Sequence, residues 1–210
     1  MYRPFKRIFD IVVGLIILAI ISLPLLLVAF LIWRHDRGPV FYRASRVARG
    51  GGFFTMLKFR TMVLNADKIG ASSTADDDPR ITRVGHFLRR YKLDELPQLL
   101  NVVGGSMSLV GPRPQVKWAV DLYTEEELLA LTVKPGITDY ASVYFPNEGE
   151  ILKGSTDPDR DYMEKIHPIK MRLCVRYVRE YSFLTDLKIL ALTGLTVLGL
   201  RRAENQLTHS

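Results

Sequence analysis

The sequence IVVGLIILAIISLPLLLVAFLIW, Ile11–Trp33, constrains the fold more than any other stretch, because none of its residues carries a formal charge. An apolar helix of this length can cross a hydrocarbon layer of about 30 Å. The run is too long for the apolar part of a cleavable signal peptide, and no small-x-small cleavage motif follows it. The simplest interpretation is a membrane-anchoring helix.

Two features of this run favour a re-entrant helix, which enters the membrane and leaves on the same side. Pro24, two residues after Ser22, interrupts helical hydrogen bonding in the middle of the run. Both flanks are rich in Lys and Arg, which is typical of segments that stay in the cytoplasm. These residues are Arg3, Lys6 and Arg7 before the run, and Arg34, Arg37, Arg43, Arg46 and Arg49 after it. A spanning helix stays open as the alternative, because spanning helices tolerate proline.

Composition narrows the class of protein. The chain of 210 residues holds 29 Lys and Arg against 22 Asp and Glu, a net charge of +7, and 48% of its residues are hydrophobic. This hydrophobic content excludes a largely disordered chain, and the single long apolar run excludes a polytopic membrane protein. One cysteine, Cys174, cannot form an intrachain disulfide. Because the positive charge brackets the apolar run, an anionic membrane surface is favoured over nucleic acid as the partner.

The rest of the chain predicts a compact, helix-rich domain of mixed α/β class. Extended segments are expected at 40–42 and 53–60, and helices over 82–92, from 94 or 95 to 104, over 124–131 and over 168–179. A second apolar segment, Leu184–Leu200, predicts either a helix that lies along the membrane interface or an ordinary core helix. The chain therefore divides into a membrane helix with basic flanks, 1–37, a compact domain, 38–202, and a flexible tail, 203–210.

The segment 70–79, GASSTADDDP, predicts a polar loop rich in turns. Its three consecutive acids, Asp76–Asp78, are compatible with a metal cluster, although a solvated acidic loop is the favoured interpretation. The sequence contains no P-loop, no nucleophile-elbow serine and no zinc-ligand spacing.

The strongest local signal for chemistry is the pair Asp94–Glu95 at a predicted helix start. Adjacent side chains on a helix do not share a face, so the two carboxylates can serve separate roles. Arg89 and Arg90 precede the pair, and Arg113 is held between Pro112 and Pro114. Two carboxylates, a divalent cation and arginines are the groups that phosphoryl transfer uses. A helix N-cap is the alternative role of Asp94, because Asp is a favoured capping residue.

Six blocks of sequence, in the same order, resemble the bacterial sugar transferases, the small monotopic phosphoglycosyl transferases of the membrane. The resemblance covers nearly the whole chain. The blocks are Lys6-Arg7-Ile8-Phe9-Asp10, Lys58-Phe59-Arg60-Thr61-Met62, Leu93-Asp94-Glu95-Leu96-Pro97-Gln98-Leu99, Ser108-Leu109-Val110-Gly111-Pro112-Arg113-Pro114, Lys134-Pro135-Gly136-Ile137-Thr138 and Asp186-Leu187-Lys188-Ile189.

The resemblance implies an enzyme of the bacterial cytoplasmic membrane, with its catalytic domain on the cytoplasmic face and a re-entrant helix broken at Ser22 and Pro24. Such an enzyme moves a sugar-1-phosphate from a UDP-sugar to polyprenol phosphate, as the first membrane step of polysaccharide or glycoconjugate assembly. Further helices would lie against the bilayer, and a homodimer is compatible with the resemblance.

The resemblance also implies roles for individual residues. Asp94 would be the nucleophile that forms an aspartyl-phosphosugar intermediate and releases UMP, and Glu95 would hold Mg²⁺ on the diphosphate. Arg89 and Arg113 would bind phosphate or nucleotide. Lys58 and Arg60 would complete the site.

The chain departs from the family pattern in two places. Leu23 separates Ser22 from Pro24, whereas these two are often adjacent in the family. After Thr138, family members commonly continue with Gly-Trp-Ala-Gln and Asn-Gly-Arg, but here the chain reads DYASVYFPN, 139–147. The arginine expected in that stretch has no counterpart, which indicates a different sugar preference.

Two other functions are compatible with the same residues. A non-enzymatic membrane adaptor would use the anchor and the basic surface without the carboxylates. A phosphohydrolase acting on nucleotide sugars would pass the phosphosugar to water instead of to a lipid.

Overall fold

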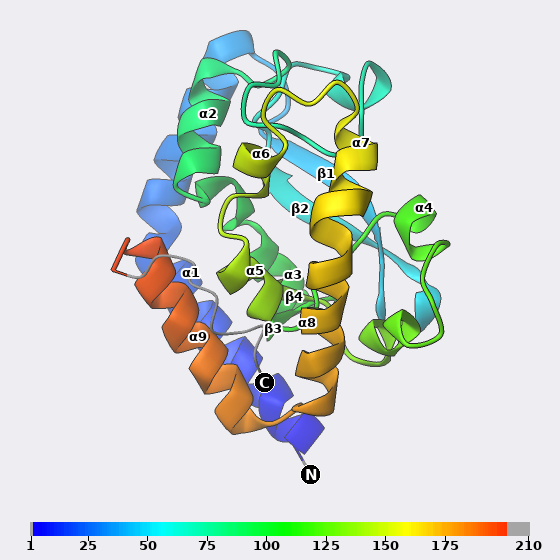
Figure 1. The fold of residues 1–210 in the computed structure, drawn as a ribbon. Coiled ribbons are helices and arrows are strands. Elements are labelled where there is room, and N and C mark those ends of the chain that lie inside the picture. Colours follow the sequence, from blue (N-terminus) through cyan, green and yellow to red (C-terminus); the bar gives the residue numbers. More distant parts are fainter. Residues whose placement is uncertain (1, 201–210) are drawn as a thin grey trace.

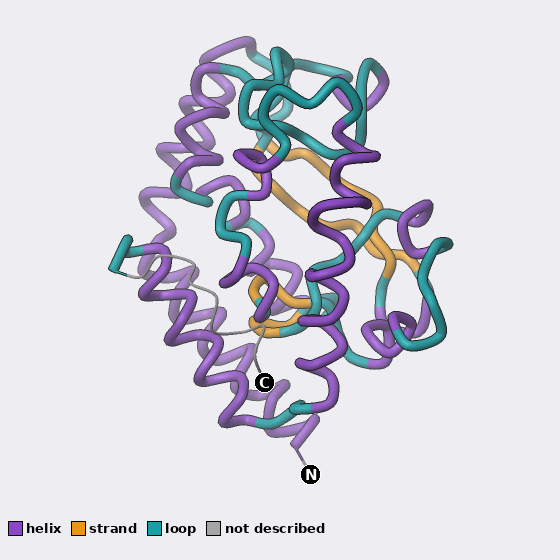
Figure 2. The backbone as a smooth tube through the Cα atoms, in the orientation of Figure 1, coloured by secondary structure: helices purple, strands orange, loops and turns teal. Residues whose placement is uncertain are grey.

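The computed structural model describes residues 2–200, and the predicted tail, 203–210, lies outside the described residues. The described part contains helices of very different length and two small sheets (Figures 1 and 2). The helices are α1 (Tyr2–Asp36), α2 (Arg83–Arg90), α3 (Gln98–Gly104), α4 (Lys117–Val120), α5 (Tyr140–Tyr144), α6 (Glu148–Ile151), α7 (Pro158–Asp161), α8 (His167–Arg179) and α9 (Phe183–Val197). The strands are β1 (Phe41–Val47), β2 (Phe53–Phe59), β3 (Ser108–Val110) and β4 (Gly136–Thr138). The predicted helix-rich, mixed α/β class is confirmed.

The two sheets are both two-stranded. Strands β1 and β2 form an antiparallel hairpin in which Phe41 pairs with Phe59 and Val47 with Phe53. Strands β3 and β4 are parallel, with Ser108 opposite Gly136. Strand β1 is longer than the segment predicted at 40–42, β2 matches the segment predicted at 53–60, and β3 corresponds to the apolar run before Gly111.

Helix α1 packs along the domain over its whole length. Phe9, Val13, Ile17 and Ile21 contact the main core, which also includes Val102, Met107 and Tyr177. Leu25, Val28 and Ile32 contact a second cluster around Phe59 and Leu88. These positions recur every three or four residues, so one face of the helix is turned to the domain. Helix α1 and the rest of the described domain therefore share their cores.

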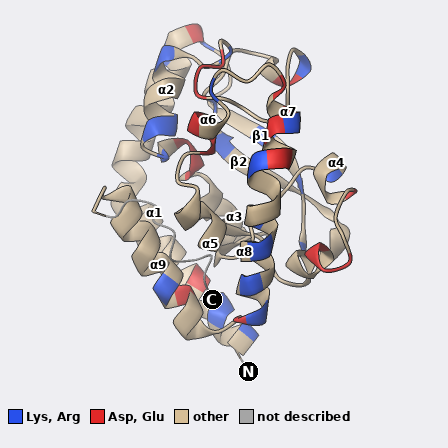
Figure 3. Ribbon diagram, in the orientation of Figure 1, with Lys and Arg blue, Asp and Glu red and all other residues tan. Residues whose placement is uncertain are grey.

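The opposite face of α1 is also apolar and it is exposed. Its exposed side chains include Val12, Ile16, Ile20, Leu23, Leu27 and Phe30. Within the described residues, α1 is the one helix long and apolar enough to cross a membrane. Helix α9 lies beside α1 (Figure 1), and it too exposes leucines, among them Leu184 and Leu195. Figure 3 shows that the middle of α1 and most of α9 carry no charged residues.

The predicted break at Ser22 and Pro24 is not present, because α1 is one continuous α-helix from Tyr2 to Asp36. Proline inside a helix removes one backbone hydrogen bond and costs about 3 kcal/mol. Here Ile17 and Ile21 before Pro24, and Leu25 and Val28 after it, all pack on the domain. This packing on both sides of the proline outweighs the local preference for a break.

Both ends of α1 are fixed to the same domain. At its beginning, Arg7 donates a hydrogen bond of 2.7 Å to the carbonyl of Val103 at the end of α3. At its end, Asp36 forms an ion pair with Arg60, just after β2. The helix therefore leaves from the domain and returns to it.

The observed helix ends lie close to the predicted ones. Thr82 caps α2 by accepting a hydrogen bond of 2.9 Å from the Gly85 amide. Gly105 ends α3 with a positive φ of 92°, a conformation that favours glycine. Thr124 and Glu127 form a capping box, but in place of the predicted helix over 124–131 the turns that follow, Glu127–Thr132, are 3-10 in type.

The acidic loop before α2 is partly solvated, with Asp77 exposed and Asp76 and Asp78 half-buried, and all three acids have partners within the domain. The amide of Asp76 donates to the carbonyl of Gly149 at 3.0 Å, and Asp77 accepts from the Gly154 amide at 3.1 Å. Asp78 instead pairs with Arg80. The Asp76 carboxylate accepts a hydrogen bond of 2.6 Å from Asn147, so the three carboxylates have three different partners. The described residues contain no group of three His, Cys, Asp or Glu side chains able to hold a metal ion.

Candidate active site

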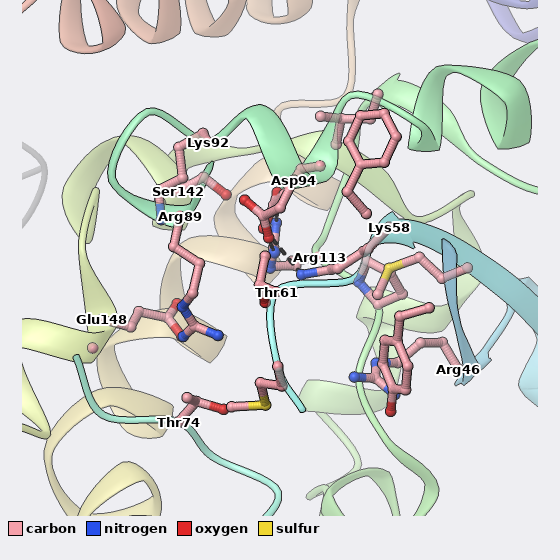
Figure 4. A pocket seen from close by; sticks show the side chains of 18 of the residues that line it. Arg46, Lys58, Thr61, Thr74, Arg89, Lys92, Asp94, Arg113, Ser142 and Glu148 are labelled. Atoms are coloured by element: carbon pink, nitrogen blue, oxygen red, sulfur yellow. Dashed lines mark hydrogen bonds and ion pairs between the residues drawn. The ribbon is translucent and has the colours of Figure 1, made fainter. Parts of the chain in front are cut away.

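A cavity of about 1190 Å³ lies between β2, the turn before α3, and the segment that contains α5 and α6. One part of its wall is charged and contains Arg46, Lys58, Arg89, Lys92, Arg113, Asp94, Glu95 and Glu148 (Figure 4). Another part is apolar and reaches Ile17 of α1, Leu99 of α3, and Leu190 and Val197 of α9. The cavity therefore connects a cluster of charges with the two helices that expose apolar surface.

Asp94 and Glu95 belong to a 3-10 turn, Leu93–Glu95, that precedes α3. Lys92 enters this turn with a φ of 56°, in the left-handed region that non-glycine residues rarely adopt. The predicted helix starting at Asp94 or Glu95 begins later, because Pro97 takes the N-cap position of α3. Asp94 makes no capping hydrogen bond there, so the N-cap role is excluded.

Glu95 is held by two cations. Arg113 donates from Nη1 to Oε2 at 2.8 Å and from Nη2 to Oε1, which makes a two-pronged ion pair. Lys58 donates to Oε1 at 3.1 Å from β2. Burial raises the pKa of Glu95, but the charges of Arg113 and Lys58 outweigh burial, and the pKa lies well below its usual value. Glu95 is therefore an ionised carboxylate that fixes two basic side chains.

Asp94 is in the opposite situation. It is buried, and no side chain or backbone group among residues 2–200 donates a hydrogen bond to its carboxylate. Burial raises its pKa, and the charges of Lys58, Arg89 and Lys92 offset only part of this effect. Two adjacent carboxylates whose pKa values are pushed in opposite directions are suited to different chemical roles. Asp94 is the one with free oxygens.

The backbone that carries Arg113 is fixed by close packing. Gly111 in the turn after β3 approaches Gly136 of β4 so closely that a Cβ on Gly136 would lie 2.1 Å from the Gly111 amide nitrogen. The Arg113 amide then donates to Asp139 at 3.2 Å. Asp139 is fully buried and also caps α5, by accepting from the Ser142 amide at 2.7 Å. The guanidinium of Arg113 is thereby held in one place.

The predicted site residues gather with one exception. Asp94, Glu95, Lys58, Arg89 and Arg113 all line the cavity, although they come from four separate segments (Figure 4). Arg60 also reaches the cavity wall, but its guanidinium pairs with Asp36 at the end of α1. Its observed contact is with the end of α1 rather than with Asp94 or Glu95.

Sequence reasoning missed several charged residues of this cavity. Arg46 of β1, Lys92, Glu148 of α6 and Lys170 of α8 also line it. Lys92 adjoins the Asp94 turn, and its positive φ has no signal in the sequence. Glu148 and Lys170 are far from the other site residues along the chain, and only the tertiary fold brings them to the cavity.

Comparisons with known proteins agree with this arrangement. The family described as "Bacterial sugar transferase" matches residues 1–199 of the chain. The chain is 40% identical over 195 residues to the UDP-glucose:undecaprenyl-phosphate glucose-1-phosphate transferase of Escherichia coli K12, covering 91% of this chain and 39% of that protein. It is 36% identical over 211 residues to the undecaprenyl-phosphate galactose phosphotransferase of Salmonella typhimurium LT2, covering 93% of this chain and 41% of that protein.

A shorter relative matches over most of its length. The uncharacterized sugar transferase EpsL of Bacillus subtilis 168 is 37% identical over 193 residues, covering 92% of this chain and 87% of that protein. The chain thus spans about two fifths of the Escherichia and Salmonella proteins and most of the Bacillus protein. With a family match over nearly all of its residues, the chain belongs to the bacterial sugar transferases.

Proposed function

We propose that this protein transfers a sugar-1-phosphate from a UDP-sugar to polyprenol phosphate, with Asp94 as the covalent nucleophile. The observation that carries the proposal is the buried carboxylate of Asp94, which has no hydrogen-bond donor among the described residues and lies in a cavity rich in basic side chains. The Asp94 oxygens are not among the buried side-chain atoms that lack a partner, so they are open to the cavity, where a ligand can reach them.

The reaction has two displacements at one phosphorus atom. An oxygen of Asp94 attacks the β-phosphorus of the UDP-sugar, the bond to the bridging oxygen breaks, and UMP leaves with that oxygen. An oxygen of polyprenol phosphate then attacks the same phosphorus and releases the carboxylate of Asp94. The product is a polyprenyl diphosphate sugar, and no other co-reactant is required.

The basic residues supply the charge that this chemistry needs. A carboxylate attacks an anionic diphosphate only where the negative charge of the phosphates is neutralised. Arg89 and Lys92 line the same cavity as Asp94 and are close enough to lower its pKa. Arg113 and Lys58, fixed on Glu95, present further N–H groups. Because these basic side chains are already in place before the substrate binds, they can stabilise the transition state without first having to reorient.

The carboxylates of the cavity are suited to bind one Mg²⁺ ion whose remaining ligands would come from the substrate. Mg²⁺ in phosphoryl-transfer sites is commonly bound by one or two carboxylates together with phosphate oxygens. Asp94 has free oxygens, and Oε2 of Glu95 accepts one hydrogen bond, which leaves it further acceptor capacity. Bound there, Mg²⁺ would neutralise charge on the diphosphate.

The position of the cavity supports a lipid acceptor. Its apolar wall is formed in part by Ile17 of α1 and by Leu190 and Val197 of α9. These helices also carry the exposed apolar side chains, which suit the interior of a bilayer. A polyprenol phosphate could therefore remain in the membrane while its phosphate reaches Asp94.

The fixed ends of α1 support a monotopic arrangement on the cytoplasmic face. Because Arg7 and Asp36 both contact the domain, α1 can place its outer face in the bilayer without carrying one end across it. The basic residues on both sides of the apolar run favour the cytoplasm. Single cysteines at Arg3 and Arg37 should resist a membrane-impermeant maleimide added to intact cells. Labelling of either one from outside would contradict this topology.

The proposed reaction is tested with purified protein, Mg²⁺, polyprenol phosphate and a panel of UDP-glucose, UDP-galactose and their N-acetylamino derivatives. We expect one UDP-sugar to yield equal amounts of UMP and lipid-linked sugar. Release of sugar phosphate without lipid would identify a phosphohydrolase. Full biological function with Asp94→Asn would identify an adaptor, and either result would contradict the proposal.

A further inference from the structure

A second ion pair lies on the cavity wall and has no part in the reaction proposed above. Lys170 of α8 donates a hydrogen bond of 2.7 Å to Oε1 of Glu148 in α6. The side chain of Lys170 is 4% exposed and that of Glu148 is 29% exposed. The lysine is therefore enclosed by protein, whereas the carboxylate is open to the cavity.

Glu148 is positioned from two sides. On one side, Lys170 of α8 holds the Glu148 carboxylate. The Lys170 Nζ lies 5.2 Å from the centre of the Tyr162 ring, and Tyr162 belongs to a small core with Leu152 and Ile166. From the loop before α2, the Asp76 amide donates to the Gly149 carbonyl at 3.0 Å. A Cβ on Gly149 would lie 2.2 Å from an oxygen of the Asp76 side chain, so a larger residue here would require that side chain to move.

The second oxygen of Glu148 is free. Oε1 accepts from Lys170, and no donor to Oε2 occurs in the part of the chain that the structure describes. Burial raises the pKa of Glu148, but the charge and the hydrogen bond of Lys170, with the charges of Arg113 and Lys92, bring it below its usual value. Glu148 therefore presents a charged acceptor to the cavity at neutral pH.

This acceptor lies close to the cations that would bind phosphate. Arg113 and Lys92 affect both Glu148 and the Asp94–Glu95 turn electrostatically, and Figure 4 shows Glu148 and Arg89 pointing toward one another. A carboxylate repels phosphate, so Glu148 suits a neutral part of the donor that carries hydrogen-bond donors. Next to a diphosphate, the hydroxyl groups of the sugar fit this description.

The geometry points to Glu148 as a contact for the sugar hydroxyls of the donor, with Lys170 as the positioning residue that holds its carboxylate. This inference rests on the proposed function and extends it to the part of the substrate that determines sugar preference. A site that hydrogen-bonds a substrate hydroxyl discriminates strongly against sugars that lack the hydroxyl or orient it differently. The ion pair thus contributes to the choice among UDP-sugars.

Comparison of UDP-sugar with UDP isolates the contact with the transferred sugar, because UDP contains the uridine and both phosphates but lacks that sugar. Binding is measured by calorimetry in an Asp94→Asn background, which prevents turnover. We expect Glu148→Gln and Glu148→Asp to weaken binding of the preferred UDP-sugar about tenfold or more, the effect of a lost hydrogen bond to a charged group. Binding of UDP should change less than twofold.

The role of Lys170 has its own test. Lys170→Met should weaken UDP-sugar binding as much as Glu148→Gln does. Lys170→Arg should bind UDP-sugar like the protein with Lys170, because arginine can also donate to the carboxylate. Glu164→Gln is the matched control, since Glu164 pairs with Arg160 on the exposed surface. Melting temperatures of all variants identify any that fail to fold.

Two results would overturn the inference. Equal weakening of UDP and UDP-sugar by both Glu148 variants would assign Glu148 to the nucleotide, and unchanged binding of both ligands would exclude a contact. Failure of the proposed transferase reaction is separate, because it would appear as absent UMP release by the wild type even where UDP-sugar binds.

Discussion

Lys6 and Asp186, which are 180 positions apart, form a buried ion pair that joins the start of α1 to the start of α9. Tyr177 of α8 also donates to Asp186, at 2.8 Å, and Tyr2 donates to the same carboxylate. Three helices therefore meet at one carboxylate. The apolar N-terminal helix is thus an integral part of the folded domain as well as the element that would enter the membrane.

Loss of the Lys6 charge should destabilise the whole domain. Removal of one partner from a buried ion pair leaves the other charge uncompensated and costs about 3–5 kcal/mol. We expect Lys6→Met to lower the free energy of unfolding in detergent by about 3 kcal/mol. Lys117→Met, which breaks the exposed pair with Asp121, is the control and should cost less than about 1 kcal/mol. Equal effects of the two variants would show that the buried pair is not structural.

Asp94→Asn should stabilise the fold while it abolishes turnover. Because the pKa of Asp94 is raised in the folded state, the native protein binds its proton more tightly than the unfolded chain does. The stability that this proton contributes is present at low pH and is lost as pH rises through the folded pKa. At pH 7.5 the variant removes the cost of a buried charge, which we expect to be about 1 kcal/mol.

Thermal unfolding checks this prediction. For a chain of this size, 1 kcal/mol corresponds to a rise of about 2–4 °C in the melting temperature. The difference between variant and wild type should shrink below the pKa of Asp94, where the wild-type carboxyl is protonated. A lower melting temperature for Asp94→Asn at pH 7.5 would mean that the ionised carboxylate stabilises the fold.

The pH dependence of UMP release should report Asp94. Attack requires the carboxylate form, so the rate should fall as pH decreases through the raised pKa of Asp94, above the usual Asp value of 3.8. Glu95, whose pKa is lowered, stays ionised throughout this range. The charge of Lys58 lowers the pKa of Asp94. In Lys58→Met, the fall in rate at low pH, which is the acid limb of the pH profile, should therefore move to higher pH.

The control for this profile is Lys68→Met, since Lys68 is exposed on the loop after β2. The acid limb of this variant should coincide with that of the wild type. An acid limb that Lys58→Met leaves in place would assign the titration to another group.

Arg113→Lys should reduce the rate although it keeps the charge. Lysine cannot reproduce the two parallel hydrogen bonds that Arg113 makes with Glu95, and it would occupy a different position in the cavity. We expect kcat for UMP release to fall about a hundredfold, the cost of removing one fixed donor from a transition state. Arg83→Lys, on the exposed side of α2, should leave kcat unchanged. A similar kcat for Arg113→Lys and the wild type would show that charge alone is required.

The sequence predicted those features of the site that depend on residue type and local spacing. Asp94, Glu95 and Arg113 form short motifs whose chemistry is recognisable, and the end of α3 at Gly105 follows from the conformational preference of glycine. These predictions succeed because each depends on a few neighbouring positions.

Other features depend on contacts between distant segments. The uninterrupted course of α1 through Pro24 results from packing on residues far from it in the sequence, such as Leu88, and the pairing of Arg60 with Asp36 depends on where that helix ends. Glu148 and Lys170 meet at the cavity only because α6 and α8 fold around the loop that contains Asp76. Local patterns contain no information on such contacts.

The intact mass of the protein after incubation with Mg²⁺ and a UDP-sugar, without any lipid acceptor, tests the central claim most directly. A covalent mechanism predicts that one UDP-sugar yields a sugar-phosphate adduct that maps to Asp94 and disappears on addition of polyprenol phosphate. The adduct should be absent from Asp94→Asn. Formation of lipid-linked sugar with no adduct at any time, or an adduct that persists in Asp94→Asn, would contradict the assignment of Asp94 as the nucleophile.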